Sequence, residues 1–268
     1  MSQRASDAGF LIFDQRPWQP RCVVRRYPIL GAIGQASARG RSEMPFLEKA
    51  LNRVLAEVGY GRVRRYVYRA NWSTSDVEHF VYFESWGQPR CFIGGDFGFK
   101  NPVADEFSRA CLLKYVPFLA QFDAYKRLDK YDCLIRVDFS HLRQPFRRFA
   151  LSIPEKSDTE VASAIRHEIE GFLLPLVRPI TDLSSLLTAL LSDAGALKWS
   201  LAGGVLVRAA QIVSIARRLG WTDSAIIAAL EPRRSELLKD SDLIDSENYI
   251  SNIIRDWDIS QMGVETVH

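Results

Sequence analysis

The chain has 268 residues, of which 47% are hydrophobic and 25% are charged, a composition typical of a folded globular protein rather than a disordered one. Its apolar runs all fall short of the roughly 18 residues that a membrane-spanning helix needs, so we expect a soluble, cytoplasmic protein. The four cysteines are widely spaced and form no CxxC pair, so the sequence predicts reduced core thiols rather than a zinc site or a disulfide framework.

The net charge of +3 is unevenly distributed along the chain. Residues 1–43 are irregular and hold seven arginines and three acidic residues, a net charge of +4, which leaves −1 for residues 44–268. Three interpretations of this Arg-rich segment stay open: an extension upstream of a natural start at Met44, a disordered or docking arm, and a targeting peptide. The first is favoured. A secretory signal is not expected, because the apolar stretch from Gly9 to Phe13 is too short.

Residues 44–195 are expected to form a folded domain that begins with an amphipathic helix. Apolar residues recur at helical spacing from Leu47 to Val58, after Pro45 and before Gly59. Asn101 with Pro102 opens a second helix. Between the two helices, three segments rich in β-branched and aromatic residues predict an antiparallel meander: Arg62–Ala70, Glu78–Trp86 and Arg90–Phe99.

The rest of this domain continues with strands and then helices. Apolar and polar residues alternate over Cys133–Phe139, which predicts a half-buried strand with Phe146–Ile153 as its neighbour. Ser157 and Glu160 form a capping-box pattern for a further helix. Pro175 and Pro179 are expected to kink or end that helix, and a Leu-rich helix follows over residues 183–191.

Residues 196–268 are expected to form a helical extension packed on the domain. The predicted fold class is therefore α+β: an antiparallel β-sheet flanked by helices, with a C-terminal helical extension. The helices of the extension are predicted over Val205–Leu219, Asp223–Leu230 and Ser246–Trp257.

The order of elements from Met44 to about Asp193 resembles that of the bacterial domain of unknown function 4304, a family of α+β proteins in which helices flank an antiparallel sheet. Members of that family have no established activity. The resemblance implies a small binding protein, such as an immunity or defence-associated factor. The resembling pieces are Phe46–Tyr60, Cys91–Phe99, Cys133–Val137, Phe149–Pro154 and Thr159–Leu191.

Motifs that would carry catalysis are weak in this sequence. Asp96-Phe97-Gly98 has the letters of the kinase magnesium-binding triplet, but the phosphate loop and catalytic loop of a kinase are missing. Gly94, Gly95 and Gly98 are better explained by a bulge or by close backbone approach within a strand. The four histidines form no metal-binding pattern, and no serine has nucleophile-elbow spacing. We therefore expect neither enzyme activity nor a cofactor or metal, and keep a cryptic enzyme as the third alternative.

Residues 212–230 have the spacing of a helix-turn-helix, which makes a nucleic-acid-binding protein the second alternative. Against it, the would-be recognition helix begins with Thr222 and Asp223 and continues with apolar residues, where base and phosphate contacts would need basic or amide groups. A plain helical hairpin is favoured, and nucleic acid is not the expected partner. The candidate nucleic-acid contacts are Arg217, Arg218, Thr222, Arg233 and Arg234.

The leading hypothesis is a non-enzymatic protein that binds a protein partner through its sheet. If residues 62–70 form one strand, Arg65 and Arg69 lie on one face and Arg64 lies on the other with two tyrosines. Arginine, tyrosine and tryptophan are enriched at interface hot spots. A second interpretation stays open, in which the aromatic side chains are core and the arginines cover them. The candidate partner-binding residues are Arg64, Arg65, Tyr66, Tyr68, Arg69 and Trp72.

Overall fold

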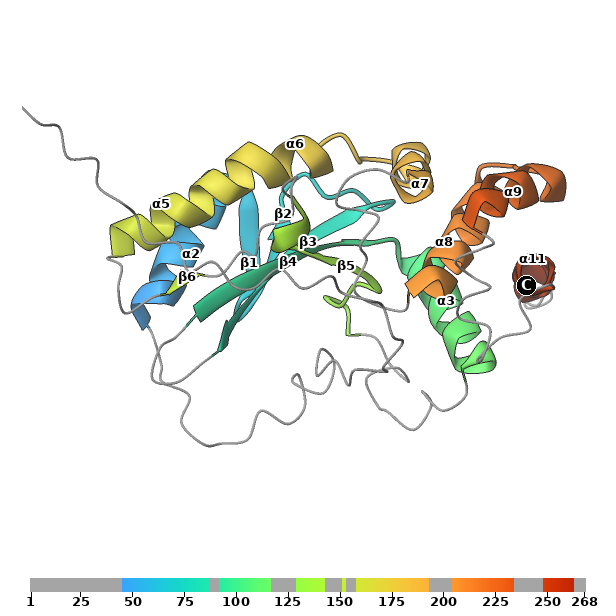
Figure 1. The fold of residues 1–268 in the computed structure, drawn as a ribbon, viewed down its shortest axis with the longest axis horizontal. Helices are drawn as coiled ribbons and strands as arrows, with labels where there is room; N and C mark the ends of the chain where they lie inside the picture. Colours follow the sequence, from blue (N-terminus) through green and yellow to red (C-terminus); the bar gives the residue numbers. More distant parts are fainter. Residues whose placement is uncertain are drawn as a thin grey trace, which may run out of the picture. The chain divides into compact units, whose positions relative to one another are not determined.

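An antiparallel β-sheet lies at the centre of the structure, a computed structural model that describes residues 45–86, 92–116, 129–142, 151–152, 158–192, 204–233 and 248–262. All of these residues belong to one unit, Ser42–His268. The strands run in the order β1-β2-β3-β4-β5, and β6 pairs with β4 (Figure 1). Their bounds are β1 (Tyr60–Arg64), β2 (Val67–Ala70), β3 (Glu78–Trp86), β4 (Phe92–Lys100), β5 (Ile135–Asp138) and β6 (Leu151–Ser152). The N-terminal segment 1–43 lies outside the described residues.

The first predicted strand, Arg62–Ala70, is wrong as a single element. The chain turns back at Arg65 and Tyr66, so that β1 and β2 form a tight hairpin in which Arg64 pairs with Val67. Tyr66 has a φ of +60°, a backbone conformation that tyrosine rarely adopts. The turn was missed because neither position carries the glycine, asparagine or proline that normally marks a hairpin. The next predicted turn, at Asn71–Asp76, separates β2 from β3 as expected.

Helices cover one face of the sheet. α2 (Pro45–Glu57) and α5 (Asp158–Glu168) pack against each other there, and their buried apolar residues join one core cluster with Tyr68 and Phe83 of the strands. α5 continues through a π-helical turn (Ile169–Leu173) into α6 (Leu174–Val177) along the sheet (Figure 1). The π turn ends two residues before Pro175, which has no N–H to donate and crowds the carbonyl four residues back.

The C-terminal helices pack on one another around a central helix. α8 (Gly204–Arg218) is buried on every side from Leu206 to Ala216 and contacts α3, α7, α9 and α11. Figure 1 shows α8, α9 and α11 gathered beside α3. The bounds of these neighbours are α3 (Pro102–Tyr115), α7 (Leu183–Leu191), α9 (Asp223–Leu230) and α11 (Tyr249–Met262). The predicted α+β class, with an antiparallel sheet and a C-terminal helical region, is confirmed.

Local signals account for several of these helix ends. Asn101 caps α3, because its side chain accepts a hydrogen bond from the N–H of Ala104 at 2.9 Å. Asp182 caps α7 in a capping box with Ser185. At the other end of α7, the Arg208 guanidinium donates to the backbone oxygens of Leu190 (2.7 Å) and Ser192 (2.6 Å), where helix carbonyls need donors.

Glycines in β4 let neighbouring chains approach closely. A Cβ atom on Gly95 would lie 2.6 Å from the Phe139 ring, and one on Gly98 would lie 2.8 Å from the backbone oxygen of Ile135. The glycine of the Asp-Phe-Gly triplet is therefore explained by strand packing, as predicted.

Cys111 and Cys133 are buried free thiols, also as predicted. In the part of the chain that the structure describes, no helix is long and apolar enough to cross a membrane.

Candidate functional site

The tip of the β1–β2 hairpin carries the exposed part of the predicted partner-binding surface. The Arg65 side chain is 41% exposed, and its guanidinium lies 5.3 Å from the centre of the Tyr66 ring. Arg62, three residues earlier on β1, has a similarly exposed side chain, at 42%. Both guanidiniums lie beside a single carboxylate, that of Glu48 on α2, at 2.5 Å for Arg62 and 3.5 Å for Arg65. The single negative charge of Glu48 is thus shared between the two positive charges of Arg62 and Arg65.

Two other members of that predicted surface are turned toward the core: Tyr68 is part of it, and Trp72 is half-buried against it. Tyr68 is only 1% exposed, and its hydroxyl donates to the Asn52 side chain at 2.8 Å. Trp72 packs edge-on against Tyr60, with ring centres 4.9 Å apart, and the Arg178 guanidinium lies over its ring. Tyr68 is therefore a core residue, as the second interpretation expected, whereas Trp72 is half-buried and the arginine over it, Arg178, is not one of the strand arginines.

Arg69 remains partly open to solvent. Its Nε lies 2.9 Å from the Glu78 carboxylate on the neighbouring strand β3. The Nε atom itself is buried, and the Glu78 side chain is 21% exposed. Arg69 lies on the inner strand β2 and, because side chains alternate along a strand, on the face opposite Tyr68 and Arg62.

Arg64 holds a segment of the chain against the second face of the sheet, the face opposite α2 and α5. Its Nη2 donates to Asp132 at 2.9 Å. Lys100 donates to the backbone oxygens of Asp129 (3.1 Å) and Lys130 (2.9 Å), and the Tyr82 hydroxyl donates to the backbone oxygen of Tyr131 (2.7 Å). Residues 129–133, hereafter the strap, are thus fastened across the strands. The strap accounts for Arg64 structurally.

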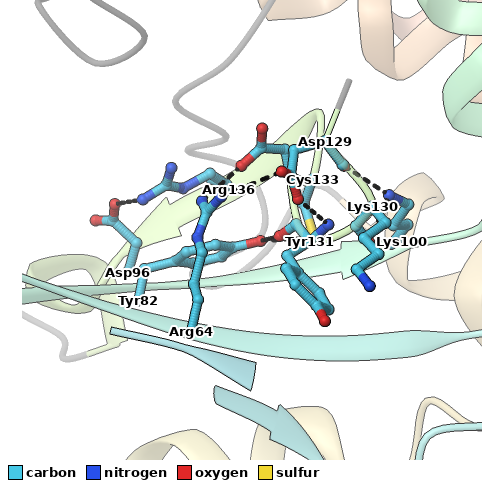
Figure 2. Close-up of polar contacts among 10 residues, drawn as sticks. Arg64, Tyr82, Asp96, Lys100, Asp129, Lys130, Tyr131, Cys133 and Arg136 are labelled. Atoms are coloured by element: carbon cyan, nitrogen blue, oxygen red, sulfur yellow. Dashed lines mark hydrogen bonds and ion pairs between the residues drawn. The ribbon is translucent and has the colours of Figure 1, made fainter. Parts of the chain in front are cut away.

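A buried ion pair lies beside the strap. The Arg136 guanidinium is 2.6 Å from the Asp96 carboxylate and 3.9 Å from the centre of the Tyr82 ring (Figure 2). Burial raises the pKa of Asp96 to about 6, Arg136 opposes the rise, and the nearby Asp138 and Glu84 add to it. Asp96 and Asp138 occupy directly opposite register positions on β4 and β5. The sequence alone could not show that Arg136 pairs with Asp96, since these residues are 40 positions apart in the chain.

The Asp96 site offers one carboxyl whose protonation changes near neutral pH, held by one arginine. Among the described residues, no three His, Cys, Asp or Glu side chains are placed to hold a metal ion. His79 is buried in the core on the other face, where its Nε2 lies 2.7 Å from the backbone oxygen of Ile180. Burial lowers the pKa of His79 to about 4, so it stays neutral at physiological pH.

The turn expected for a helix-turn-helix is present between α8 and α9. Gly220 has a φ of +77° and donates to the Arg217 oxygen, while Trp221 donates to the Ala216 oxygen, both at 2.9 Å. These two bonds form a Schellman motif, which needs a residue with positive φ. Thr222 caps α9 by accepting from the N–H of Ala225. Gly220 therefore follows the end of α8, close to the end predicted for that helix at Leu219.

The basic residues near this turn are engaged within the protein. Arg217 donates to Asp258 of α11 at 3.0 Å and also pairs with Asp223, and Arg218 donates to the Asn101 side chain at 3.1 Å. Arg233 is buried and donates to the backbone oxygens of Ala229 and Leu191. Arg234 lies outside the described residues. The exposed residues of α9 are Asp223, Ser224, Ala225, Ile227 and Ala228.

Comparisons with known proteins found no match: no family model fits the chain, and neither the curated proteins nor the solved structures include a similar one. The resemblance to the domain of unknown function 4304 accordingly stays a prediction.

Proposed function

We propose that this chain is a non-enzymatic protein that binds a protein partner at the β1–β2 hairpin. The observation that carries the proposal is the position of β1 at the end of the strand order, with accessible arginines along it. Within the described residues no strand pairs with the outer side of β1. Arg65, whose guanidinium lies over the Tyr66 ring at the tip of the hairpin, has the chemistry of an interface hot spot.

The strained conformation of Tyr66 supports the same location. A positive φ at a bulky residue costs free energy and persists only where the surrounding structure holds it. Here the backbone oxygen of Tyr66 accepts from the N–H of Phe83 at 2.9 Å, which fixes the turn to β3. The hairpin thus presents a large aromatic side chain, partly exposed, at a rigid tip.

Capture experiments with matched variants test the proposal. The wild-type chain, Arg65→Ala, Tyr66→Ala and the distant control Arg255→Ala would each be used to capture proteins from a lysate of the source cells. We expect one protein to be recovered with the wild type and with Arg255→Ala, and to be lost with both hairpin variants. Equal recovery with all four chains, or no recovered protein, would contradict the proposal.

An immunity or defence role is the more specific form of this proposal. In that case the captured partner would be a toxic protein encoded beside this chain, and binding would suppress its toxicity. Co-expression of the two genes tests this: cells should survive with the wild-type chain and die with Tyr66→Ala. If cells survive with both the wild-type chain and Tyr66→Ala, protection does not depend on binding at the hairpin.

Nucleic-acid binding is the second candidate, because the α8–α9 turn has the expected geometry. The internal ion pairs of Arg217 and the absence of basic residues from the exposed positions of α9 weigh against it. Titration with generic duplex DNA at low salt separates the two functions, since phosphate-driven binding is strongest there. Binding that is lost on raising the salt and unaffected by Tyr66→Ala would favour nucleic acid.

A further inference from the structure

Exposed positive charge continues from the hairpin onto the solvent side of α2. Lys49 and Arg53 are exposed and lie one helical turn apart, so they share one side of the helix. Glu48, the carboxylate that Arg62 and Arg65 approach, directly precedes Lys49. Successive residues of a helix are rotated by only about 100°, so the two pairs of cations lie on adjoining parts of the surface. Lys49, Arg53, Arg62 and Arg65 are hereafter called the basic patch.

The basic patch carries more positive charge than its own acidic residue balances. Its four cations and Glu48 give a net charge of +3. Glu57, the other acidic residue of α2, pairs with Arg166 of α5. Residues 70–268 hold 22 basic and 27 acidic residues, a net charge of −5, so the basic patch does not reflect a generally basic chain.

Arg65 is the member of the basic patch that is best placed to bind a carboxylate from another molecule. Its Nε lies 3.5 Å from the Glu48 carboxylate, whereas Nη2 of Arg62 lies 2.5 Å from it. The Tyr66 ring lies against the Arg65 guanidinium and limits its orientations. Because Glu48 approaches Nε, the parallel N–H groups on Nη1 and Nη2 of Arg65 can donate to a second carboxylate.

Resting on the proposed protein-binding function, we infer that the partner presents an acidic surface to the basic patch. One partner carboxylate accepts hydrogen bonds from Arg65 beside the Tyr66 ring, and others face Lys49 and Arg53 on α2. Glu48 lies between the arginines and therefore weakens the attraction of the basic patch for the partner.

A nucleic acid and a second copy of this chain fit the basic patch less well. The group that Arg62 and Arg65 hold in this structure is a carboxylate. The Arg65 guanidinium lies over the Tyr66 ring, so that face of the ring is not open to stack with a base. Two copies that met patch to patch would bring like charges together, which is costly.

Matched charge variants separate the basic patch from the net charge of the chain. Arg65→Gln and the control Arg255→Gln on α11 each remove one positive charge, and Arg65→Lys keeps the charge. Glu48→Gln and the control Glu106→Gln on α3 each remove one negative charge. Both control residues are exposed. The probes are fluorescent short peptides of alternating Glu and Ser or of alternating Lys and Ser, and a short DNA duplex, each titrated into the full chain at low salt. Circular dichroism verifies that every variant folds.

We expect the Glu–Ser peptide to bind the wild type at least about tenfold more tightly than the Lys–Ser peptide and to lose affinity as salt is added. Arg65→Gln should weaken this binding about fivefold, and Arg65→Lys should recover part of the loss, because the charge is kept and the fork of N–H groups is not. Glu48→Gln should strengthen the binding about threefold. Both control variants should stay within about twofold of the wild type.

Several results would overturn the inference. These are equal binding of the two peptides, equal effects of Arg65→Gln and Arg255→Gln, and a Glu48→Gln variant that binds the Glu–Ser peptide no better than the wild type does. DNA binding that is tighter than peptide binding and depends on Arg65 would replace the acidic protein by a nucleic acid. Self-association of the wild type that Arg65→Gln abolishes would replace it by a second copy.

Failure of this inference is distinguishable from failure of the proposed function. If the Glu–Ser peptide does not bind but Tyr66→Ala still abolishes capture of the cellular protein, the hairpin is the binding site and the acidic partner surface is wrong. If the peptide binds through Arg65 but capture of a cellular protein does not depend on the hairpin, the proposed function is wrong. If neither the peptide nor a cellular protein depends on the hairpin, both are wrong.

Discussion

Individual glycines in β4 are constrained by what lies within van der Waals distance of them. Gly98 faces the backbone oxygen of Ile135 and the side chain of Cys133, neither of which can move without disturbing the pairing of β4 with β5. Such crowding cannot be read from a sequence, where the same glycine also fits a kinase triplet. It becomes visible once the two strands are adjacent.

Gly98→Ala is expected to destabilise the protein by about 2 kcal/mol, because the new methyl group would lie 2.8 Å from the Ile135 oxygen. The control is Gly171→Ala, where the nearest atom is 3.8 Å away and the backbone is helical. That change should be neutral or slightly stabilising. Urea unfolding measures both, and a similar midpoint for the two variants would contradict the packing argument.

Asp105 on α3 is expected to make the protein less stable as the pH rises. Its carboxyl is fully buried, and one oxygen accepts from Gln211 of α8 at 2.5 Å. Burial raises the pKa of Asp105 well above its usual value, Lys100 opposes the rise and Glu78 adds to it. A group whose folded pKa is raised contributes stability below its unfolded pKa, near 4, and loses it as the pH rises through the folded value.

Asp105→Asn should therefore flatten the fall in the free energy of unfolding between about pH 5 and about pH 8. Urea titrations at these two values give the slope. The exposed Asp182→Asn is the matched control, because hydrogen bonds from Ser185 lower the pKa of Asp182 and keep it ionised throughout that range. A wild-type slope in the Asp105 variant would show that this carboxyl is not responsible.

The ends of helices and the positions of turns can be predicted from nearby residues more reliably than the packing around a single residue can. The α8–α9 connection illustrates this, since α9 spans Asp223–Leu230 as predicted and Gly220, with its positive φ, follows the end of α8. The hairpin at Arg65 and Tyr66 is the opposite case, because the turn is held by β3 rather than by turn-forming residues. Local preference there is overridden by strand pairing.

Gly220→Ala is expected to cost about 1 kcal/mol, for backbone reasons alone: φ is +77° and no atom lies within 4 Å of the new Cβ. Gly220→Asn should recover part of that loss, since asparagine tolerates this conformation. Thermal unfolding of the two variants compares them directly. An alanine variant as stable as the wild type would contradict the Schellman geometry.

The sheet and the C-terminal helices share one core rather than forming two. α8 is buried between α3 and the other C-terminal helices, and the Phe107 ring of α3 meets Trp257 of α11 at 5.0 Å. A helix buried on all sides needs neighbours from both halves of the chain. The extension predicted for residues 196–268 therefore completes the burial of α3.

A chain that ends at residue 195 should lose the cooperative unfolding of the intact protein, because the α8 side of α3 would be exposed to water. The matched control ends at residue 262 and keeps α11. Calorimetry is the measurement: one transition for the control, and a strongly lowered or absent transition for the shorter chain. An unchanged midpoint for the shorter chain would mean that residues 1–195 fold on their own.

The α+β class, the central strands and most helix starts were predictable because they depend on periodicity and capping among residues close together in the chain. The Arg64–Asp132 pair, 68 residues apart, and the Asp105–Gln211 pair, 106 residues apart, were not. The candidate partner-binding residues differ in burial: Tyr68 is buried, Trp72 is half-buried against the core, and Arg65 is exposed at the tip of the hairpin. Which side of a strand is covered depends on distant elements packing against it, and only the folded chain brings those elements together.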